Sequence, residues 1–355
     1  MRFEEMARAP APWQSEDAPE RDIVLSCRVR LARNVEGQVF PHLLGEDALR
    51  NLRSRILRAA ASCPSADPPS SWAMEELEEL ERRFLLERHL VSQELVATPI
   101  GRAVLMSEDE SRGLMVNEED HLRIQAFGSG LQPKETLDIA MRFASELEEH
   151  LTFAHSPRLG YLSACPTNLG TGLRASVLLH LPGISLTRDL EKVLHSLKVL
   201  NYTVRGFYGE GSGALGELFQ VSNSATLGLS GAQIVDDLLH HLRKVISVER
   251  EARAVLLERE GTRIEDRVFR AWGILNNARL LTTREAFDLL GDVRLGMSFR
   301  LLPGVDETTL RCLLVTIQGA HQEIMAQRSL KPHERDERRA DYVRRALAKA
   351  RKDQE

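Results

Sequence analysis

The hydrophobic periodicity of the chain changes near residue 230, and this change limits the folds that the chain can adopt. From Asp22 to Asn223, apolar runs that alternate as in strands are interleaved with glycine turns and amphipathic helices. After Ser230, which has the side chain of a helix N-cap, the apolar residues follow a helical period, and the first long helix is expected to stop at Gly261. We therefore predict an α+β fold in three parts: a flexible N-terminal tail over 1–21, an α+β domain over 22–255 and an all-helical C-terminal domain over 256–355.

Composition and charge exclude several classes of protein. The net charge of -5 gives no reason to expect nucleic acid as a direct partner. No apolar run is long enough to span a membrane, and the N-terminus lacks the hydrophobic segment of a signal peptide, so no membrane association is expected. The four cysteines have neither CxxC pairing nor metal-ligand spacing, which predicts free thiols in the reducing cytoplasm and no metal held by protein residues alone.

Two arginines share one face of the strand predicted for DIVLSCRVRLARN, residues 22–34. Odd positions from Ile23 to Leu31 are apolar, whereas Arg28 and Arg30 occupy even positions. Two guanidiniums on a half-buried face repel each other unless an anion lies between them, and phosphate oxygens match the guanidinium fork. A solvated strand face with scattered partners explains this segment about equally well.

A carboxylate and an arginine lie on one face of a second predicted strand, in MVNEEDHLRIQAFGSG, residues 115–130. Alternation places Glu119, His121, Arg123 and Gln125 on the face opposite the apolar residues. Such a pair is usually a simple ion pair, but in a cleft the two residues can act as a base and a phosphate clamp.

The segment YLSACPTNLGTGLRASVLLHL, residues 161–181, places Cys165 in a glycine-containing turn between two apolar runs. Arg174 begins the second run, with Ser176 and His180 on its face. Structural cysteines usually lie inside apolar strands. A cysteine in a turn near several arginines favours the thiolate, which can act as a nucleophile or hold a cation.

A fourth segment, NYTVRGFYGEGSGALGELFQVSN (201–223), is rich in glycine and carries Arg205 and Glu210. Its GSGALG matches GxGxxG, but a strand rather than a helix is expected to follow, so a dinucleotide site is not supported. The chain has no P-loop and no HRD or DFG triplet. A mobile loop with one arginine is typical of a lid that closes over phosphates.

One ligand explains these segments together. The arginines come from four separate parts of the chain, and their convergence on a triphosphate is the simplest joint interpretation: Arg28, Arg30, Arg123, Arg174 and Arg205.

The segments SCRVRLARN, NEEDHLR, CPTNLGTGLRASV and VRGFYGEG resemble the ATP:guanidino phosphotransferases, the phosphagen kinase family that includes creatine and arginine kinases. They occur in the family's order between about residues 22 and 235, and CPTNLGTGLR is a highly specific signature. The resemblance implies a catalytic domain with an eight-stranded antiparallel sheet flanked by helices. It also implies ATP as the donor, Mg²⁺ held mainly through the ATP phosphates, and in-line transfer to a guanidinium nitrogen.

The resemblance also implies roles for individual residues. Glu119 would be the catalytic base, Cys165 would hold the acceptor guanidinium, and His89 would pack beside the adenine. The nucleotide would contact residues of three segments besides His89 and Arg123: Ser26, Cys27, Arg28, Val29 and Arg30; Arg174, Ala175, Ser176, Val177 and Leu178; Arg205, Gly206, Phe207, Tyr208 and Gly209.

Three departures from the family's pattern point to a larger acceptor. The helical N-terminal domain of small-metabolite kinases is not expected, because the arginine strand already begins near Asp22. The loop reads RGFYGEG instead of RGTGG, which adds the carboxylate of Glu210, and a helical domain follows the catalytic domain. An open pocket with an extra carboxylate suits an arginine displayed on a protein, and the whole sequence resembles the bacterial protein arginine kinases.

The charged C-terminal helix contains RDERRA, residues 335–340. Arg335 and Arg339 are four residues apart, with Asp336 adjacent, so they share one helix face. A solvated charged helix is the usual explanation of such a segment. The resemblance implies instead that Arg335, Asp336 and Arg339 bind phosphoarginine and regulate activity allosterically.

These observations predict a cytoplasmic, ATP-dependent kinase of arginine side chains in proteins. The resemblance implies a role in stress response and protein quality control, in which marked proteins are degraded by a Clp unfoldase–protease. It further implies a zinc-finger activator protein and a heat-shock repressor as partners, and assembly as a homo-oligomer. The alternatives are a free-arginine kinase and a non-catalytic phosphoarginine-binding adaptor. The first conflicts with the expected lack of the N-terminal domain, and the second with the complete set of Glu119, Cys165 and arginines.

Overall fold

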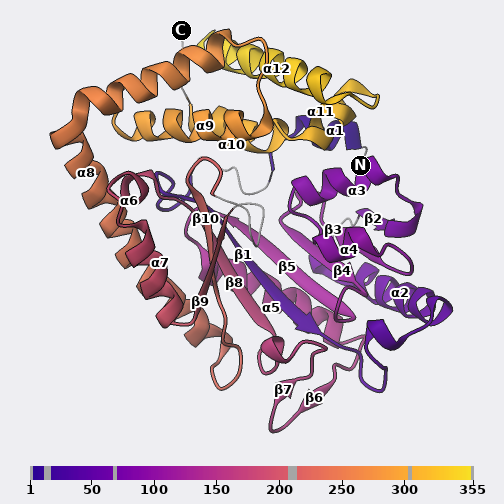
Figure 1. Ribbon diagram of the computed structural model, residues 1–355. Helices are drawn as coiled ribbons and strands as arrows, with labels where there is room; N and C mark the ends of the chain where they lie inside the picture. The colour runs from indigo at the N-terminus through magenta and orange to yellow at the C-terminus, as the bar shows by residue number, and fades with distance from the viewer. Residues whose placement is uncertain (1–2, 12–16, 67–69, 207–213, 303–305, 353–355) are drawn as a thin grey trace. The chain divides into compact units, whose positions relative to one another are not determined.

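The computed structural model describes residues 3–11, 17–66, 70–206, 214–302 and 306–352. Their main sheet has eight strands in the order β2-β3-β4-β5-β1-β8-β10-β9, and β6 and β7 form a separate hairpin (Figure 1). The predicted eight-stranded sheet and α+β class are thus confirmed. The strands are β1 (Val24–Arg33), β2 (Ser70–Ala73), β3 (Ala103–Met106), β4 (Arg112–Val116), β5 (Leu122–Ser129), β6 (His155–Ser156), β7 (Gly160–Tyr161), β8 (Leu173–His180), β9 (Tyr202–Gly206) and β10 (Leu218–Asn223).

Helices precede, connect and follow these strands. The α-helices are α1 (Phe3–Arg8), α2 (Glu46–Ala61), α3 (Glu79–Glu87), α4 (Gln93–Ala97), α5 (Pro133–Glu148), α6 (Pro182–Leu186), α7 (Leu190–Val199), α8 (Gly231–Asn277), α9 (Thr283–Ser298), α10 (Glu307–Thr316), α11 (Gly319–Ala326) and α12 (Pro332–Lys352). Among the described residues, no helix has the length and apolar composition needed to cross a bilayer.

The chain divides into two compact units that alternate along the sequence. Unit 1 contains residues 26–177 and 222–240, and unit 2 contains residues 2–25, 178–221 and 241–355. The consecutive domains predicted from the sequence therefore differ from these units, because residues 178–221 group with the C-terminal helices.

Unit 1 is built on antiparallel pairs between β2 and β3, β3 and β4, β4 and β5, and β5 and β1. Alternation in β1 follows the sequence pattern, since Cys27 and Val29 are buried while Arg28 and Arg30 are half-buried on the other face. Each fully buried apolar side chain of this kind contributes about 1.5–3 kcal/mol. Helix α5 packs against β5, and a Cβ at Gly128 would lie 2.5 Å from Thr136 Oγ1, so glycine permits this close approach.

Unit 2 corrects one prediction and agrees with another. Residues Phe3–Arg8 are not a loose tail: they form α1, which packs against α11 with Met6 and Ala7 buried. The first long helix is interrupted beside Gly261, as predicted: the backbone of Glu260 is non-helical, with φ -129° and ψ 25°, and the kink there separates two helical segments that together make up α8 (Figure 1). The turns beyond the kink hold the helix in place through buried side chains, namely Ile264, Val268, Ala271 and Leu275.

Candidate active site

Four arginines from three strands of unit 1 form a cluster of positive charge. Arg28 and Arg30 lie on β1, Arg123 on β5 and Arg174 on β8. Burial and the positive charges of Arg123 and Arg174 lower the pKa of Arg28 to about 10, and burial together with the other three arginines lowers the pKa of Arg30 well below its ordinary value. The guanidiniums are therefore close enough to repel one another, and an anion placed among them would relieve this repulsion.

Neighbouring groups orient these side chains before any ligand binds. Arg28 lies 5.8 Å from the centre of the Phe127 ring and donates from Nη1 to the carbonyl of His89 at 3.4 Å. Arg174 Nη2 donates to Ser222 Oγ at 3.1 Å. The buried Nε of Arg30 has no hydrogen-bond partner among the described residues, which suits an oxygen supplied by a ligand.

Three consecutive acidic residues precede β5 and have three different environments. Glu118 is almost fully buried, with 3% of its side chain exposed, and forms an ion pair with Arg123 Nη1. Burial would raise the pKa of Glu118, but Arg123, a hydrogen bond from Ser92 and the charge of Arg30 lower it, so this carboxylate is ionised. Glu119 lies 3.1 Å from Arg123 Nη2 and keeps 35% of its side chain exposed, so it is the accessible carboxylate.

The third acidic residue, Asp120, anchors the loop that carries Cys165. Its Oδ2 accepts a hydrogen bond from Ser163 Oγ at 2.8 Å, and its Oδ1 accepts from the backbone N–H of Ala164 at 2.7 Å. Asn34, at the end of the arginine strand, donates to the same Oδ1 at 2.6 Å. A buried carboxylate thus fixes the backbone beside Cys165 to both β1 and the acidic segment.

The Cys165 loop is tied directly to Glu119. Cys165 is partly exposed, and its Sγ lies 2.9 Å from Thr167 Oγ1. Asn168 donates from its backbone N–H to the Cys165 carbonyl at 2.9 Å and from Nδ2 to Glu119 Oε1 at 2.9 Å. At the end of this loop Gly172 has φ +62°, and a Cβ there would lie 2.6 Å from the Ala32 carbonyl, so only glycine lets the loop lie this close to β1.

The sequence interpretation missed several residues that hold this arrangement. Among the three adjacent carboxylates before β5 the sequence predicts a role for Glu119 alone, although Glu118 and Asp120 lie in the same acidic run next to a strand with an arginine. The sequence predicts no role for Asn168 or Asn34 either. For Ser222, no sequence signal was present, because its role depends on the pairing of distant strands.

The other predicted nucleotide-contacting residues fall into two groups. Ser26 and His89 are partly exposed, and the buried Ser176 donates from Oγ to the Arg28 carbonyl at 3.2 Å. The other predicted contacts on β1 and β8 have buried side chains, so a nucleotide would reach them through backbone atoms only. These residues are Cys27, Val29, Ala175, Val177 and Leu178.

Part of the predicted lid cannot be placed at the arginine cluster. Arg205 and Gly206 end β9, which belongs to unit 2. Phe207, Tyr208, Gly209 and Glu210 lie outside the described residues.

The predicted phosphoarginine motif lies on α12 in unit 2. Arg339 is buried, and its guanidinium donates to the carbonyls of Ile317 and Leu281, both at 2.5 Å, and to Asp336 Oδ1 at 2.6 Å. Arg335 is partly exposed and pairs with Glu323 at 2.8 Å. The accessible members of the predicted site are therefore Arg335 and Asp336, whereas the fork of Arg339 is already occupied.

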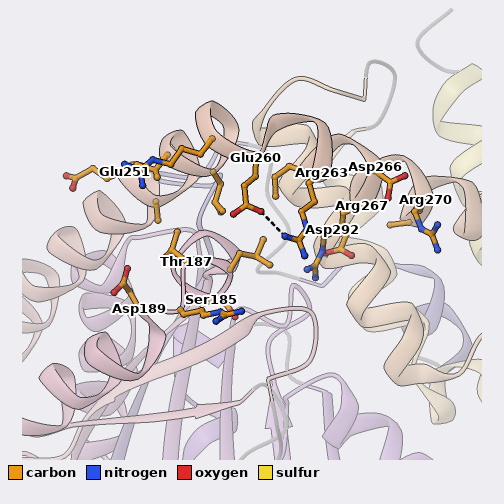
Figure 2. Close-up of a pocket in the computed structure, with 18 of the residues that line it drawn as sticks. Ser185, Thr187, Asp189, Glu251, Glu260, Arg263, Asp266, Arg267, Arg270 and Asp292 are labelled. Carbon is orange, nitrogen blue, oxygen red and sulfur yellow. Dashed lines mark hydrogen bonds and ion pairs between the residues drawn. The ribbon is translucent and has the colours of Figure 1, made fainter.

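A cavity of about 1100 Å³ in unit 2 has a different character (Figure 2). The turn after α6, helix α8 and helix α9 line it, with five arginines and five carboxylates. Glu260 pairs with Arg263 at 3.2 Å and Asp292 with Arg267 at 2.7 Å. Because its charges balance, and because its lining includes no residue predicted for catalysis, this cavity is not a candidate phosphate site.

No group of three or more His, Cys, Asp or Glu side chains that could hold a metal ion occurs within the described part of the chain. The arginine cluster, Glu119 and Cys165 can instead bind a polyanion beside a cation, which is the arrangement needed to join a phosphoryl group to a guanidinium.

Sequence comparisons agree with this chemistry. Residues 54–252 match the family model for the ATP:guanido phosphotransferase C-terminal catalytic domain, and residues 261–355 match the model for the protein-arginine kinase McsB C-terminal domain. A protein-arginine kinase of Pelotomaculum thermopropionicum is 42% identical over 348 residues, which cover 97% of this chain and 98% of that protein. A protein-arginine kinase of Geobacillus stearothermophilus is 42% identical over 342 residues, which cover 96% and 94%.

Solved structures share the fold of the catalytic part. Lombricine kinase superposes with a TM-score of 0.60 at 26% identity, over 69% of this chain and 72% of that chain. A duplicated taurocyamine kinase of Schistosoma mansoni, with bound transition state analog components, has the same TM-score and identity over 68% of this chain and 35% of that one.

Proposed function

Because the chain belongs to the ATP:guanido phosphotransferase family, and within it to the protein-arginine kinases, we propose that it transfers the γ-phosphoryl group of ATP to arginine side chains of other proteins. One observation carries this proposal. A cluster of four arginines lies beside the accessible carboxylate of Glu119, and Asn168 joins that carboxylate to the Cys165 loop.

The arginine cluster fits the donor. Arg28, Arg30, Arg123 and Arg174 would hold the phosphates of ATP, since the unpartnered Nε of Arg30 and the mutual repulsion of the guanidiniums both call for anionic oxygens. Mg²⁺ bound to those phosphates would supply further neutralisation of charge. Fixed cations around the phosphates stabilise the charge that shifts to the leaving oxygen in transfer.

The acidic segment and the cysteine loop fit the acceptor. A guanidinium is a poor nucleophile because its pKa exceeds ~12, so it must be oriented and must lose a proton as it reacts. Cys165 and Glu119 would orient it. The N–P bond forms as the bond between the γ-phosphorus and the ADP oxygen breaks, and the proton of the attacking nitrogen passes to Glu119.

The C-terminal helical region supports a protein acceptor over free arginine. Residues 261–355 match a domain named for protein-arginine kinases, and the relatives that match nearly the whole chain carry that name. Lombricine kinase and the duplicated taurocyamine kinase are similar over 69% and 68% of the chain, respectively.

The finer parts of the proposal extend to the role of the product. We propose that phosphorylated proteins are marked for a Clp unfoldase–protease during cytoplasmic stress response, with a zinc-finger activator and a heat-shock repressor among the partners. Arg335 and Asp336 would bind phosphoarginine, and Arg339 would hold them in place. Binding there would regulate the activity of a homo-oligomer allosterically. The partial exposure of Arg335 and Asp336 on α12 supports this part.

The direct test offers two acceptors to the purified chain with ATP. One reaction contains a substrate protein with exposed arginines and the other contains free arginine, and products are analysed by mass spectrometry without acid, since N–P bonds are acid-labile. We expect phosphoarginine on the protein and little turnover of free arginine, with transfer reduced by roughly 10²-fold or more in Glu119→Gln. Efficient turnover of free arginine alone would establish the alternative, a small-molecule guanidino kinase. Binding of phosphoarginine without transfer to either acceptor would establish the adaptor.

A further inference from the structure

Thr226 holds the loop that carries Cys165, although it lies far from that loop in the sequence. It belongs to the segment between β10 and α8, which is part of unit 1, as the Cys165 loop is. The residue is buried, with 6% of its surface exposed. Neither the predicted nucleotide contacts nor the proposed proton transfer uses it.

The hydroxyl of Thr226 faces two carbonyl groups of the loop. Its Oγ1 lies 2.8 Å from the Thr167 carbonyl oxygen and 2.7 Å from the Leu169 carbonyl oxygen. These two carbonyls flank Asn168, which donates from Nδ2 to Glu119 Oε1 at 2.9 Å. Because a hydroxyl has a single proton, this one donor serves both carbonyls and fixes the backbone on each side of Asn168.

The backbone of Thr226 holds the far end of the same loop. Its carbonyl accepts from the Thr171 N–H at 3.1 Å and from Thr171 Oγ1 at 3.2 Å. Between these contacts Gly170 has φ +99°, and a Cβ there would lie 2.6 Å from the Thr226 carbonyl oxygen. Glycine therefore lets the loop pack directly against residue 226.

The segment that carries this threonine is itself fixed beside the arginine cluster. Asn223 makes two hydrogen bonds to the backbone of β8, at 2.7 and 3.0 Å. Ser222, one residue earlier, accepts from Arg174 Nη2 at 3.1 Å. The short segment 222–226 thus contacts a guanidinium of the cluster at one end and the Cys165 loop at the other.

We propose that Thr226 is a positioning residue for the acceptor, because its hydroxyl sets the place of the Cys165 loop relative to Glu119 and Arg174. The inference rests on the proposed function, in which Glu119 and Cys165 orient the acceptor guanidinium and the arginine cluster binds the donor. In-line transfer needs these groups at a fixed spacing, and small displacements of reacting groups reduce the rate strongly. Thr226 acts through the loop and touches neither reactant.

Kinetics of three variants test the role of the hydroxyl. Thr226→Val removes it while keeping the shape of the side chain, and should lower kcat/KM for a protein acceptor by about tenfold, since buried carbonyls lose their donor. The KM for ATP should stay unchanged. Thr226→Ser retains the hydroxyl and should restore most of the activity. The control Thr316→Val removes another buried hydroxyl, which donates to the Cys312 carbonyl at 2.9 Å, and should match the parent in both constants. Parent-like kinetics of Thr226→Val, or an equal loss in Thr226→Ser, would overturn the proposal.

Hydrogen exchange provides a test that needs neither ATP nor an acceptor. Backbone amides of residues 163–171 should exchange faster in Thr226→Val than in the parent, and Thr226→Ser should resemble the parent. Exchange in β5 should be the same in all three proteins, which separates a local effect from a general loss of stability. Thr226→Ala removes the hydroxyl without placing a methyl group against the two carbonyls, so it decides the question if Thr226→Val does not fold.

The two measurements also distinguish this inference from the proposed function. Equal exchange of residues 163–171 in the parent and in the variants without the hydroxyl would overturn the role of Thr226, whether or not the chain is a kinase. Lack of transfer by the parent, together with the expected exchange pattern, would reject the proposed function and still support Thr226 as the residue that holds the loop.

Discussion

Asn168 Nδ2 donates a hydrogen bond of 2.9 Å to Glu119 Oε1. Through this bond the turn that carries Cys165 and the acidic segment before β5 keep a fixed spacing, since the backbone of Asn168 is itself bonded to the Cys165 carbonyl. The group proposed to accept a proton and the group proposed to hold the acceptor are therefore linked through a single residue, Asn168.

Asn168→Ala should lower kcat by about tenfold, the effect of losing one hydrogen bond to a charged group. The KM for ATP should stay unchanged, because the arginine cluster does not depend on this bond. Steady-state kinetics with a protein acceptor measure both constants, and Arg158→Ala, at an exposed site of the same unit, is the control. A rise in the ATP KM with unchanged kcat would show that Asn168 acts on the nucleotide instead.

Glu119→Gln should reduce transfer by roughly 10²-fold or more, because it removes a general base while keeping the volume of the side chain. ATP affinity should change little, since Arg123 keeps its ion pair with Glu118. The matched variant Glu118→Gln should have the opposite profile, a loss of ATP affinity, because Arg123 then loses its buried partner. Titration of ATP together with single-turnover rates separates the two, and loss of ATP binding in Glu119→Gln would reject the base assignment.

Cys165 should be the cysteine of unit 1 that an alkylating reagent modifies, and ATP with a protein acceptor should slow the reaction. Cys27 and Cys63 are buried; burial raises the pKa of the Cys27 thiol and raises the pKa of Cys63 to about 11, so both should be inert. Cys165→Ala should raise the KM for the acceptor more than the KM for ATP. Full activity after stoichiometric alkylation of Cys165, confirmed by peptide mapping, would disprove its role.

The sequence predicted the parts of the site that are set by local pattern. Alternation on β1 was enough to place Arg28 and Arg30 on one face, and the family resemblance predicted the eight-stranded sheet. Contacts between distant segments were not predictable in this way: Asp120 meets Asn34 and Ala164 only because the strands pair in one register. The local signal at Gly261 agrees with the kink of α8 at Glu260. At Arg339 the local signal misled, because its charge suggested exposure although three acceptors surround it in the interior.

The free energy of unfolding should fall as the pH drops from about 7.5 to 5.5. Burial lowers the pKa of His121 below 6.5, and the ring is held neutral because Nδ1 accepts from Val35 N–H at 3.0 Å and Nε2 donates to the Val39 carbonyl at 2.8 Å. Below pH 6.5 His121 binds a proton in the unfolded chain but not in the folded chain. Its contribution to the free energy of unfolding is therefore fully present above pH 6.5 and is lost as the pH falls. His180, whose pKa is also lowered by burial, acts in the same direction.

Denaturant titrations across this pH range test the assignment to His121. His121→Gln should be less stable at neutral pH by about 1–3 kcal/mol, because its buried hydrogen bonds are disturbed, but it should lose less stability on acidification than the parent. Ile56→Val, a core substitution without a titrating group, should lower stability by about 0.5–1.5 kcal/mol equally at every pH. If the free energy of unfolding changed equally with pH in the parent and in His121→Gln, His121 would not be the group responsible.

Substitutions of Arg335 and Arg339 should have different effects, the first on phosphoarginine binding and the second on stability. Arg335 is partly exposed and pairs with Glu323, so Arg335→Ala should weaken phosphoarginine binding by about tenfold or more, the effect of losing a charge-assisted hydrogen bond of about 1.5–3 kcal/mol. It should leave the unfolding temperature and basal transfer almost unchanged.

Arg339→Ala should instead lower the unfolding temperature, because it leaves the carbonyls of Ile317 and Leu281 and the carboxylate of Asp336 without their donor. Calorimetric titration of phosphoarginine, with ATP as the control ligand, and thermal unfolding of each variant distinguish the two effects. Unchanged phosphoarginine binding by a folded Arg335→Ala protein would show that residues 335–340 form a charged helix with a structural role and do not bind phosphoarginine.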